Sequence, residues 1–394
     1  MNNQSIYIIS EDFYPSRGAT AQLATELALG LIRSGYKIVV LTKYSGAYDD
    51  LGISTITFAR SSSTGSVVHK SIRGILFSLY LIFWGLFRLE RHSNLLIFSN
   101  PPFIGLCGTL LKLFKGSRYI FILQDLFPRS AVLSGILPPS GILTLAWRKL
   151  IKLACRHSSR TILLSQAMKD RSLLEYGWLD NVSVISNWAL ESKPPNQSTS
   201  HQIVSKWQAR NHFVVLYSGN FGRLHEFITL LECARLTEDL PIKYIFAGKG
   251  AKFNHIKTYK EHFKLENVVI DEPCDLEALN SVIAIADLCV ISLAPGSDDT
   301  VAPSKLYGIL ANGKPVLVIS SSRAEIAQMV SKYNNGTHVH PGDIQTLRDR
   351  LVHLSRDKQT ITKMGENSFE LYRSKYGLSK SLPKYIELLN TIPD

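Results

Sequence analysis

Two segments of the sequence combine glycines with a basic side chain in a manner suited to a phosphate group. The first, residues 218–223 (SGNFGR), follows a predicted strand and precedes a predicted helix. Its glycines let backbone N–H groups approach an oxyanion, and Arg223 adds a forked cationic donor at the predicted helix N-terminus, where the helix dipole favours negative charge. The alternative interpretation is a tight turn without a ligand.

The second segment, residues 302–316 (APSKLYGILANGKPV), places a lysine where a helix alone disfavours it. Ser304 stands at a predicted N-cap, Lys305 follows in the first helical turn, and Gly313 lies at the helix end. A cation at the positive end of its own helix is unfavourable unless a bound diphosphate supplies the missing negative charge. We therefore expect Arg223 and Lys305 to hold one diphosphate without a metal ion. The alternative for Lys305 is a solvated surface lysine.

Apolar runs and their spacing predict the elements that position these segments. A strand at 6–10, a loop at 11–18, a helix with leucines at 23, 27 and 31, and a strand at 36–42 form a βαβ unit. The second half predicts strands at 212–218, 242–247, 267–270, 288–293 and 315–320, with helices at 226–236, 276–286 and 304–311. The predicted fold class is α/β, with two Rossmann-like doubly wound domains facing across a cleft.

The length of 394 residues exceeds one ordinary domain, so two domains of about 190 residues each are expected. The polar run 191–201 is the predicted flexible linker. We assign residues 1–190 to an N-terminal acceptor-side domain and 191–375 to a C-terminal donor-binding domain. The terminal helix, at about 376–394, is expected to pack back on the first domain.

The net charge of +12 favours an anionic partner, namely nucleic acid, a phosphate-bearing substrate or an acidic membrane surface. The basic residues are dispersed and no RNP-type aromatic motif accompanies them, so nucleic acid is not the expected partner. Five scattered cysteines without a C-x-x-C pair argue against disulfides and zinc: Cys107, Cys155, Cys233, Cys274 and Cys289. The N-terminus lacks a signal-peptide pattern, and a cytoplasmic location is expected.

Two apolar segments of the first half allow two interpretations. Residues 75–87 are uncharged and lie between Arg73 and Arg88, but a membrane-spanning helix needs about 20 apolar residues. Residues 131–147 are apolar with a break at two prolines, and the basic residues of 148–156 follow them. Both segments could fill the domain core, or lie on an anionic membrane surface. A peripheral position at the inner face of the cytoplasmic membrane is our expectation.

Several motifs resemble glycosyltransferase family 4, whose members are retaining enzymes of the GT-B fold. The resemblance is strongest over 214–343 and rests on GNFGR, FAGKGA, the Ala286-Asp287 pair and PSKLYGILANGKPV. The Phe13-Tyr14-Pro15 turn and Gly18 look like that family's acceptor-side loop. Residues 124–128 (QDLFP) and 185–188 (ISNW) resemble motifs of members that build bacterial surface polysaccharides.

The resemblance implies roles for individual residues. Arg223 and Lys305 match the family's diphosphate-binding basic residues, and Asp125 stands where many members place a polar residue near the reacting sugar carbon. The alternative for Asp125 is a helix-capping residue. We take these three residues as catalytic. The donor-binding residues are expected to be Gly18, Gly219, Asn220, Gly222, Gly248, Gly250, Asp299, Pro303, Ser304 and Leu306.

The sequence also departs from the family pattern. Thr300 and Gly308 replace the usual pair of glutamates, and Thr229 replaces a second basic residue six positions after Arg223. These departures put the contacts to the ribose and the sugar in doubt. The neighbouring carboxylates, Asp298 and Asp299, could substitute, or could be solvated loop residues.

The expected function is retaining transfer of a hexose from a nucleotide-diphosphate sugar, UDP being favoured over GDP, without a cofactor or metal. The expected acceptor is a polyprenyl-linked or other lipid-linked intermediate of exopolysaccharide, O-antigen or capsule synthesis. A dehydrogenase is excluded because residues 11–18 lack G-x-G-x-x-G. A sugar-nucleotide epimerase is a further alternative. So is a non-catalytic subunit of a polysaccharide assembly complex with a degenerate donor site, which the missing glutamates favour.

Overall fold

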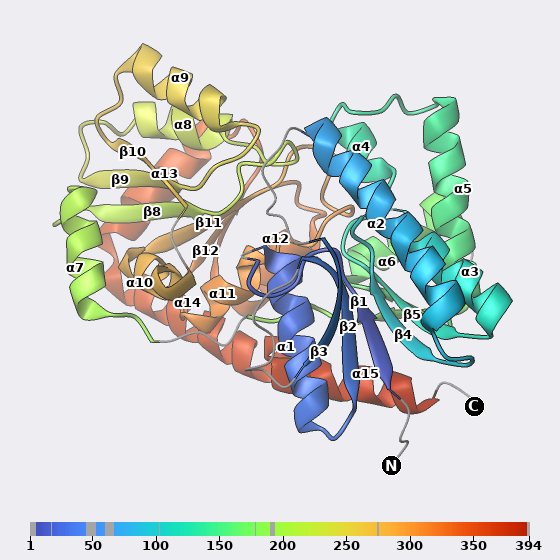
Figure 1. Cartoon of the computed structure of the whole chain (residues 1–394). Helices are drawn as coiled ribbons and strands as arrows, with labels where there is room; N and C mark the ends of the chain where they lie inside the picture. The colour runs from blue at the N-terminus through green and yellow to red at the C-terminus, as the bar shows by residue number, and fades with distance from the viewer. Residues whose placement is uncertain are drawn as a thin grey trace. The chain divides into compact units, whose positions relative to one another are not determined.

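The chain folds into two compact α/β units (Figure 1). The computed structural model describes residues 5–16, 18–44, 53–59, 67–101, 103–177, 179–189, 194–273 and 276–391. Unit 1 comprises Met1–Leu190, Thr300–Ala302 and Leu378–Asp394, and unit 2 comprises Glu191–Asp299 and Pro303–Gly377. Three residues of the second half, Thr300–Ala302, thus belong to unit 1. The predicted domain boundaries assigned them to the C-terminal domain.

Unit 1 is built on a seven-stranded sheet in the order β3-β2-β1-β4-β5-β6-β7. All its strand pairs are parallel. The central strands are apolar apart from Asn94 and Arg118 at the starts of β4 and β5, because both faces of the sheet are covered. The strands are β1 (Ile6–Ile9), β2 (Ile38–Tyr44), β3 (Ser54–Ala59), β4 (Asn94–Phe98), β5 (Arg118–Leu123), β6 (Arg160–Leu163) and β7 (Val182–Val184).

Helices cover both faces of this sheet. Ile6 and Ile8 of β1 share a core with α1 (Ala19–Arg33) and α15 (Leu378–Thr391). The alternate residue, Ile9, shares the opposite core with α2 (Val67–Arg88), α3 (Gly105–Lys115) and α5 (Ile142–His157). Two further helices complete the unit, α4 (Arg129–Leu133) and α6 (Gln166–Tyr176). The C-terminal helix α15 packs on α1 within unit 1, its Leu382 side chain lying against Gly30.

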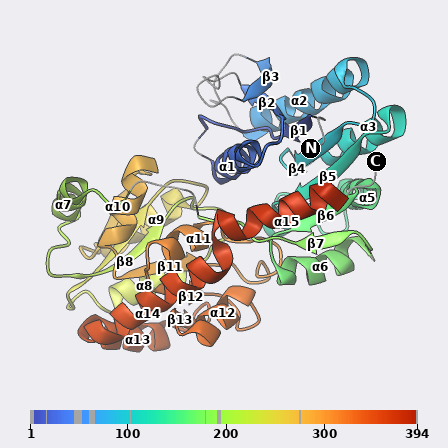
Figure 2. The same ribbon diagram turned by 90° about the horizontal axis from the view of Figure 1, so that it is seen from below.

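Unit 2 contains a six-stranded parallel sheet in the order β10-β9-β8-β11-β12-β13. Figure 2 shows α8 and α13 on one side of this sheet and α7 and α10 on the other. The strands are β8 (Phe213–Ser218), β9 (Ile242–Ala247), β10 (Val268–Asp271), β11 (Leu288–Ser292), β12 (Val316–Ile319) and β13 (Gly336–Val339). The helices are α7 (Gln197–Lys206), α8 (Ile228–Arg235), α9 (Phe253–Phe263), α10 (Leu276–Ile285), α11 (Lys305–Ala311), α12 (Glu325–Tyr333), α13 (Ile344–Arg356) and α14 (Lys358–Leu371), and the π-helix η2 (Tyr372–Tyr376) follows α14.

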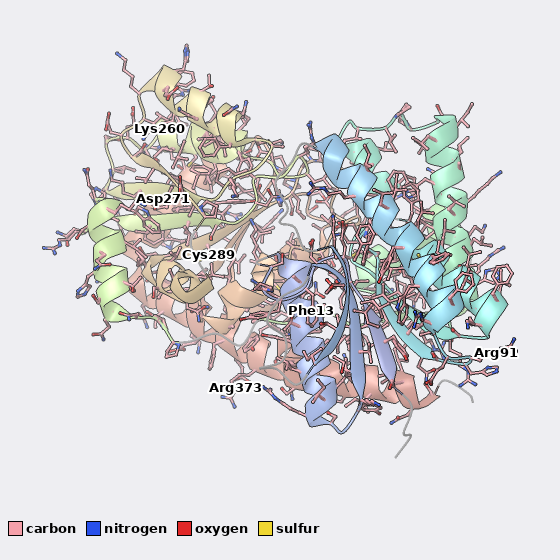
Figure 3. The ribbon with its side chains drawn as sticks, viewed as in Figure 1. Phe13, Arg91, Lys260, Asp271, Cys289 and Arg373 are labelled. Atoms are coloured by element: carbon pink, nitrogen blue, oxygen red, sulfur yellow. The ribbon has the colours of Figure 1, made fainter. Side chains whose placement is uncertain are left out.

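The predicted fold class of two doubly wound Rossmann-like α/β domains is confirmed. The prediction of a flexible linker at 191–201 is wrong from Gln197 onwards, because α7 begins there. The side chain of Asn196 caps this helix by accepting from Thr199 N at 3.3 Å. At the other end of α7, Trp207 Nε1 donates to Asp271 of β10 at 2.7 Å, which fixes the helix to the sheet of unit 2. Figure 3 labels Asp271 among the side chains of this unit. Residues 191–193 lie outside the described residues.

Each of the two apolar segments of unit 1 contains both buried and exposed side chains. On α2, Phe77 and Leu81 are fully buried in the core, while Leu79 and Phe83 are 57% and 66% exposed. The segment 131–147 contains the end of α4 and the start of α5, and Ile142 at that start is 89% exposed. No helix in the described part of the chain is both long and apolar enough to cross a membrane.

Candidate functional site

The loop after β8 is held backbone to backbone against the loop after β9. Gly219 has φ +122°, a conformation that favours glycine, and its N–H donates to Ala247 O at 2.9 Å. A Cβ on Gly248 would lie 1.9 Å from Gly219 O, so only glycine fits there. A Cβ on Gly250 would lie 2.5 Å from Asn220 Oδ1. The structure therefore brings these predicted donor-binding residues together at the carboxyl ends of two neighbouring strands.

Lys305 reaches this loop from the first residue of α11. Its Nζ lies 3.4 Å from the centroid of the Tyr217 ring, and a Cβ on Gly219 would stand 3.6 Å from it. The Nζ atom is buried and has no hydrogen-bond acceptor among the described residues. Burial lowers the pKa of Lys305 to about 7. The ammonium is therefore not a solvated surface group, and it occupies a place that an anion would complete.

Ser304 occupies the predicted N-cap position of α11, but its side chain does not cap the helix. Ser304 precedes α11, but it adopts helical angles (φ −57°, ψ −29°) and its side chain makes no capping hydrogen bond. A capping hydroxyl normally requires extended backbone at this position, which aims the oxygen at the first turn. Ser304 is exposed and Leu306 is buried, so of these two predicted donor-binding residues only Ser304 presents its side chain to solvent.

Arg223 does not stand at a helix N-terminus, in contrast to the prediction. The helix α8 begins five residues later, at Ile228. The Glu226 carboxylate accepts from Thr229 N at 3.0 Å, so a side chain of the protein already satisfies part of this helix end. Arg223 is exposed, and within the described residues its side chain makes no hydrogen bond or ion pair. It is available to a ligand without the aid of the helix dipole.

His225 belongs to the same group of side chains, and the sequence interpretation missed it. Its Nδ1 donates to the Ser292 carbonyl at 2.9 Å, which leaves Nε2 as an acceptor. Burial, together with the charges of Lys305 and Lys252, lowers the pKa of His225 to about 4. A Cβ on Gly222 would lie 3.3 Å from Nε2. A neutral imidazole acceptor therefore lies beside the glycine loop. The one sequence signal was a histidine two positions after Arg223.

The two remaining predicted residues of the first half lie in unit 1. Asp125 follows β5, and burial raises the pKa of its carboxyl to about 6. The helix-capping alternative for Asp125 is wrong, because α4 begins at Arg129 after an N-cap at Pro128. Gly18 is the N-cap of α1 with φ −70°, and the nearest atom to an added Cβ is 3.9 Å away, so no conformational requirement for glycine exists there.

The segment that carries Thr300 contacts the Asp125 loop. Asp125 forms an antiparallel bridge with Val301, and Leu126 N donates to Thr300 O at 3.2 Å. Arg129 Nε donates to the buried Thr300 hydroxyl at 2.9 Å. A threonine that accepts from an arginine therefore stands where the family resemblance places a glutamate.

The carboxylates proposed as substitutes also have partners. Asp298 Oδ1 accepts from Ser321 N at 3.4 Å, and Asp299, which is half-buried, makes an interaction of its own. Pro303 is half-buried and precedes the N-cap of α11. Gly308 lies within α11, where its carbonyl accepts from the Asn312 side chain at 2.9 Å.

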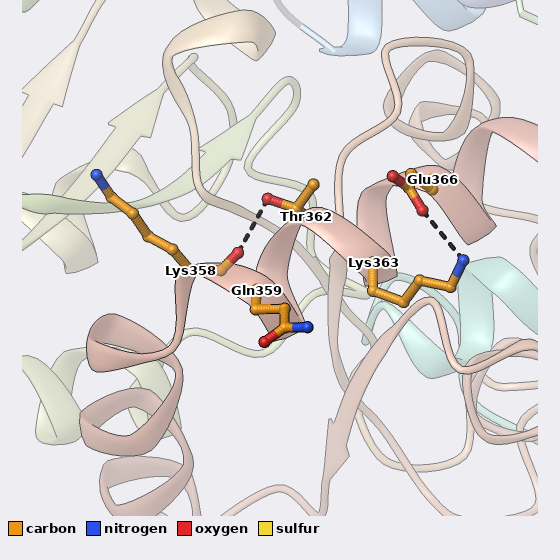
Figure 4. A pocket seen from close by; sticks show the side chains of 5 residues that line it. All are labelled: Lys358, Gln359, Thr362, Lys363 and Glu366. Carbon is orange, nitrogen blue, oxygen red and sulfur yellow. Dashed lines mark hydrogen bonds and ion pairs between the residues drawn. The ribbon is translucent and has the colours of Figure 1, made fainter.

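The described residues contain no group of three or more His, Cys, Asp or Glu side chains that could hold a metal ion. Four cysteines of the described chain are free and buried, and Cys274 lies outside the described residues. A surface hollow on α14 contains none of the predicted site residues (Figure 4). Two of its polar groups have partners within the hollow: Lys363 pairs with Glu366 at 3.0 Å, and the Thr362 hydroxyl donates to Lys358 O at 2.9 Å. We assign it no ligand. The hollow is lined by Lys358, Gln359, Thr362, Lys363 and Glu366.

Residues 201–371 match the family model of glycosyl transferases group 1. The matched region contains both glycine loops and Lys305. The fold of the whole chain is that of the GT-B glycosyltransferases: HepE of Anabaena, solved with UDP-glucose, superposes with a TM-score of 0.74 at 17% identity, over 98% of this chain and 100% of HepE.

Two curated proteins are similar in sequence. A probable glycosyltransferase of Pseudomonas aeruginosa, WbjE, is 23% identical over 259 residues, which is 65% of this chain and 64% of WbjE. A putative colanic acid biosynthesis glycosyl transferase of Escherichia coli, WcaI, is 22% identical over 188 residues, 47% of this chain and 46% of WcaI. The similarity thus spans less than two thirds of either relative's length.

Proposed function

We propose that the protein is a glycosyltransferase that binds the diphosphate of a nucleotide sugar with Lys305 and the loop 219–223. The buried Lys305 ammonium without an acceptor is the observation that carries this proposal. Burying a charged group without a partner costs several kcal/mol, at least as much as burying a neutral polar group without a hydrogen bond. A diphosphate would remove that cost. The solved structures of HepE with UDP and with UDP-glucose support a donor of this class.

The proposed reaction retains the anomeric configuration. The acceptor oxygen forms its bond to the anomeric carbon on the face from which the diphosphate departs, the bond from that carbon to the phosphate oxygen breaks, and this oxygen takes the hydroxyl proton. Lys305, the exposed Arg223 and the backbone N–H groups of the loop would stabilise the negative charge on the leaving diphosphate. His225 Nε2 would accept a hydrogen bond from the donor, and Asp125 would orient the sugar or the acceptor.

A thermal-shift screen of the full chain against UDP- and GDP-linked hexoses tests the donor assignment. A ligand at 100 times its dissociation constant stabilises the folded state by about 2.7 kcal/mol. We expect one nucleotide sugar, UDP-linked in preference to GDP-linked, to raise the melting temperature. Release of nucleoside diphosphate with an added lipid-linked acceptor would then show transfer. If no nucleotide sugar in the panel changed the melting temperature, the proposal would be wrong.

We expect transfer to be independent of metal ions, because a basic pair replaces the carboxylates that usually hold magnesium or manganese. Full activity should therefore persist after EDTA treatment, measured as nucleoside diphosphate released per minute. A control reaction with added magnesium should give the same rate. Loss of turnover with EDTA that magnesium restores would contradict the proposed role of Arg223 and Lys305.

We further propose that unit 1 binds the surface of an anionic bilayer, where a lipid-linked acceptor would lie. Five apolar residues form an exposed stripe along α2 at spacings of four, three, four and four: Ile72, Leu76, Leu79, Phe83 and Phe87. The C-terminal end of α3 lies near the end of α2, because His92 N, shortly after α2, donates to Lys115 O at the end of α3. The exposed Leu113 and Phe114 of α3 therefore extend this apolar surface.

The same helices of unit 1, together with α5, also carry exposed basic side chains. Arg88 and Arg91 follow the apolar stripe of α2, and Lys112 lies beside Leu113 on α3. Lys149 and Arg156 are exposed on α5, whose first turn carries the exposed Ile142. Apolar side chains of this kind can insert into the membrane interface. Each well-placed Lys or Arg adds about 1 kcal/mol of attraction to a membrane of negative charge.

A further inference from the structure

The two parts of the proposed diphosphate site meet at one buried side chain, that of Tyr217 in β8. Its hydroxyl donates to Asn220 O in the glycine loop at 2.9 Å, and its ring face lies 3.4 Å from Lys305 Nζ. Tyr217 is fully buried, and Phe227 packs edge-on against it with ring centroids 4.8 Å apart. Neighbouring rings therefore fix the orientation in which Tyr217 meets the lysine.

The ring attracts the ammonium without using its hydrogen-bond donors. The negative face of an aromatic ring stabilises a cation, most strongly where water is excluded. It accepts no conventional hydrogen bond, so the N–H groups of Lys305 stay available for a phosphate. The hydroxyl of Tyr217 remains a donor to the loop, because burial raises its pKa.

Among the described residues, no carboxylate forms a hydrogen bond with Lys305. The neighbouring His225 is neutral because its pKa is lowered to about 4, and burial alone lowers the pKa of Lys305. Contact with the ring therefore offsets part of the cost of burying the charged form of Lys305 in the unliganded protein.

We propose that Tyr217 is the positioning residue of this site, which holds the Lys305 ammonium on its ring face and fixes the glycine loop through its hydroxyl. The proposal rests on the donor site assigned above. It concerns how the protein presents the site, which can be measured without any nucleotide.

The experiment separates the ring from the hydroxyl with Tyr217→Leu and Tyr217→Phe. Protein labelled with ¹³C at the lysine ε-carbon is titrated by NMR, and Lys305→Met assigns the resonance. In the wild type, the ε-protons of Lys305 should be shifted upfield by the ring current. Tyr217→Phe should keep this shift and the pKa of Lys305. Tyr217→Leu should lose the shift and lower the pKa, because the charged form loses its aromatic contact.

Binding of UDP-glucose, measured by calorimetry, supplies the second readout. We expect Tyr217→Leu to weaken it about tenfold, within the range for a desolvated cation–π contact. Tyr217→Phe should weaken it about threefold through the lost hydrogen bond to Asn220. Tyr244→Phe is the matched control: Tyr244 is a buried tyrosine of the same unit whose hydroxyl lies 2.9 Å from Thr237 Oγ1, away from the site. It should leave both readouts unchanged.

The outcomes distinguish this inference from the donor assignment. If Tyr217→Leu kept the Lys305 resonance, its pKa and the UDP-glucose affinity, Tyr217 would not position the lysine. Should Tyr217→Leu fail to fold, an unshifted Lys305 resonance in the wild type, or one that moves in Tyr217→Phe, would overturn the proposal. If the resonances behave as expected while UDP-glucose does not bind the wild type, the positioning role stands and the donor assignment is what fails.

Discussion

Lys305→Met is expected to weaken the binding of a nucleotide-diphosphate sugar by about 10- to 100-fold while raising the melting temperature. The loss corresponds to one charge-assisted hydrogen bond, about 1.5–3 kcal/mol. The gain in stability follows because methionine fills the same space beside Tyr217 without the cost of a buried, unpaired ammonium. Calorimetric titration with UDP-glucose and differential scanning calorimetry measure the two effects.

Lys314→Met is the matched control for this prediction. Lys314 is also largely enclosed in unit 2, but its Nζ donates to Ala284 O at 2.6 Å. Its replacement should lower the melting temperature and leave the affinity unchanged, the opposite of the pattern at Lys305. Unaltered affinity in Lys305→Met would contradict the donor assignment.

The stability difference between Lys305→Met and the wild type should depend on pH. The folded protein lowers the pKa of Lys305 from 10.5 to about 7, so between these values the unfolded chain binds more protons and wild-type stability rises with pH. The advantage of the methionine variant is therefore largest below pH 7 and shrinks between about pH 7 and 10.5. A difference that did not change with pH would mean that Lys305 is not an unpaired buried ammonium.

The fold could be predicted where single strands are buried on both faces. The apolar runs of β1, β8 and β9, in which Lys243 is the one charged residue, can be recognised from the local sequence. Parallel strands covered by helices on both faces lose the alternation that half-exposed strands show. The edge strands β3 and β13 could not be recognised in the same way. Most residues of β13 (GTHV) are only partly buried, and its first glycine is required by contact with Val316 of β12, which local sequence does not contain.

The candidate site could be predicted in its residues but not in its environment. Glycines and cations at two strand ends identified the loop 219–223 and Lys305 from their types and spacing. The burial of Lys305 could not be derived in this way, because it depends on Tyr217, which lies 88 positions earlier in the chain. The position of Arg223 relative to α8 was wrong for a local reason: Glu226 and Phe227 precede the helix, which begins at Ile228, and the Glu226 carboxylate accepts from Thr229 N in its first turn.

Replacing Leu79 and Phe83 of α2 with serine is expected to abolish most binding of the protein to anionic liposomes and to leave it folded. Both side chains are more than half exposed, so their loss removes little from the core. Each substitution would remove about 1.5–3 kcal/mol of the free energy gained by burying an apolar side chain in the membrane. This loss corresponds to a decrease of at least about tenfold in the partition coefficient between membrane and water. Liposome flotation at low salt, with and without anionic lipid, measures the effect. Added salt should weaken wild-type binding without eliminating it, because only the basic contribution is screened.

Two control variants separate the membrane surface from the core and from general hydrophobicity. Phe77→Ser with Leu81→Ser changes the buried side of the same helix and should unfold unit 1 rather than detach it, since a buried aromatic replaced by a small residue costs about 3–5 kcal/mol. Leu236→Ser with Phe263→Ser removes two exposed apolar residues of unit 2, 39% and 40% exposed, and should float like the wild type. If the wild type itself stayed with the soluble fraction on anionic liposomes at low salt, the exposed stripe of α2 would not be a membrane surface. Equal flotation of the wild type and the Leu79/Phe83 variant would place the contact elsewhere on the chain.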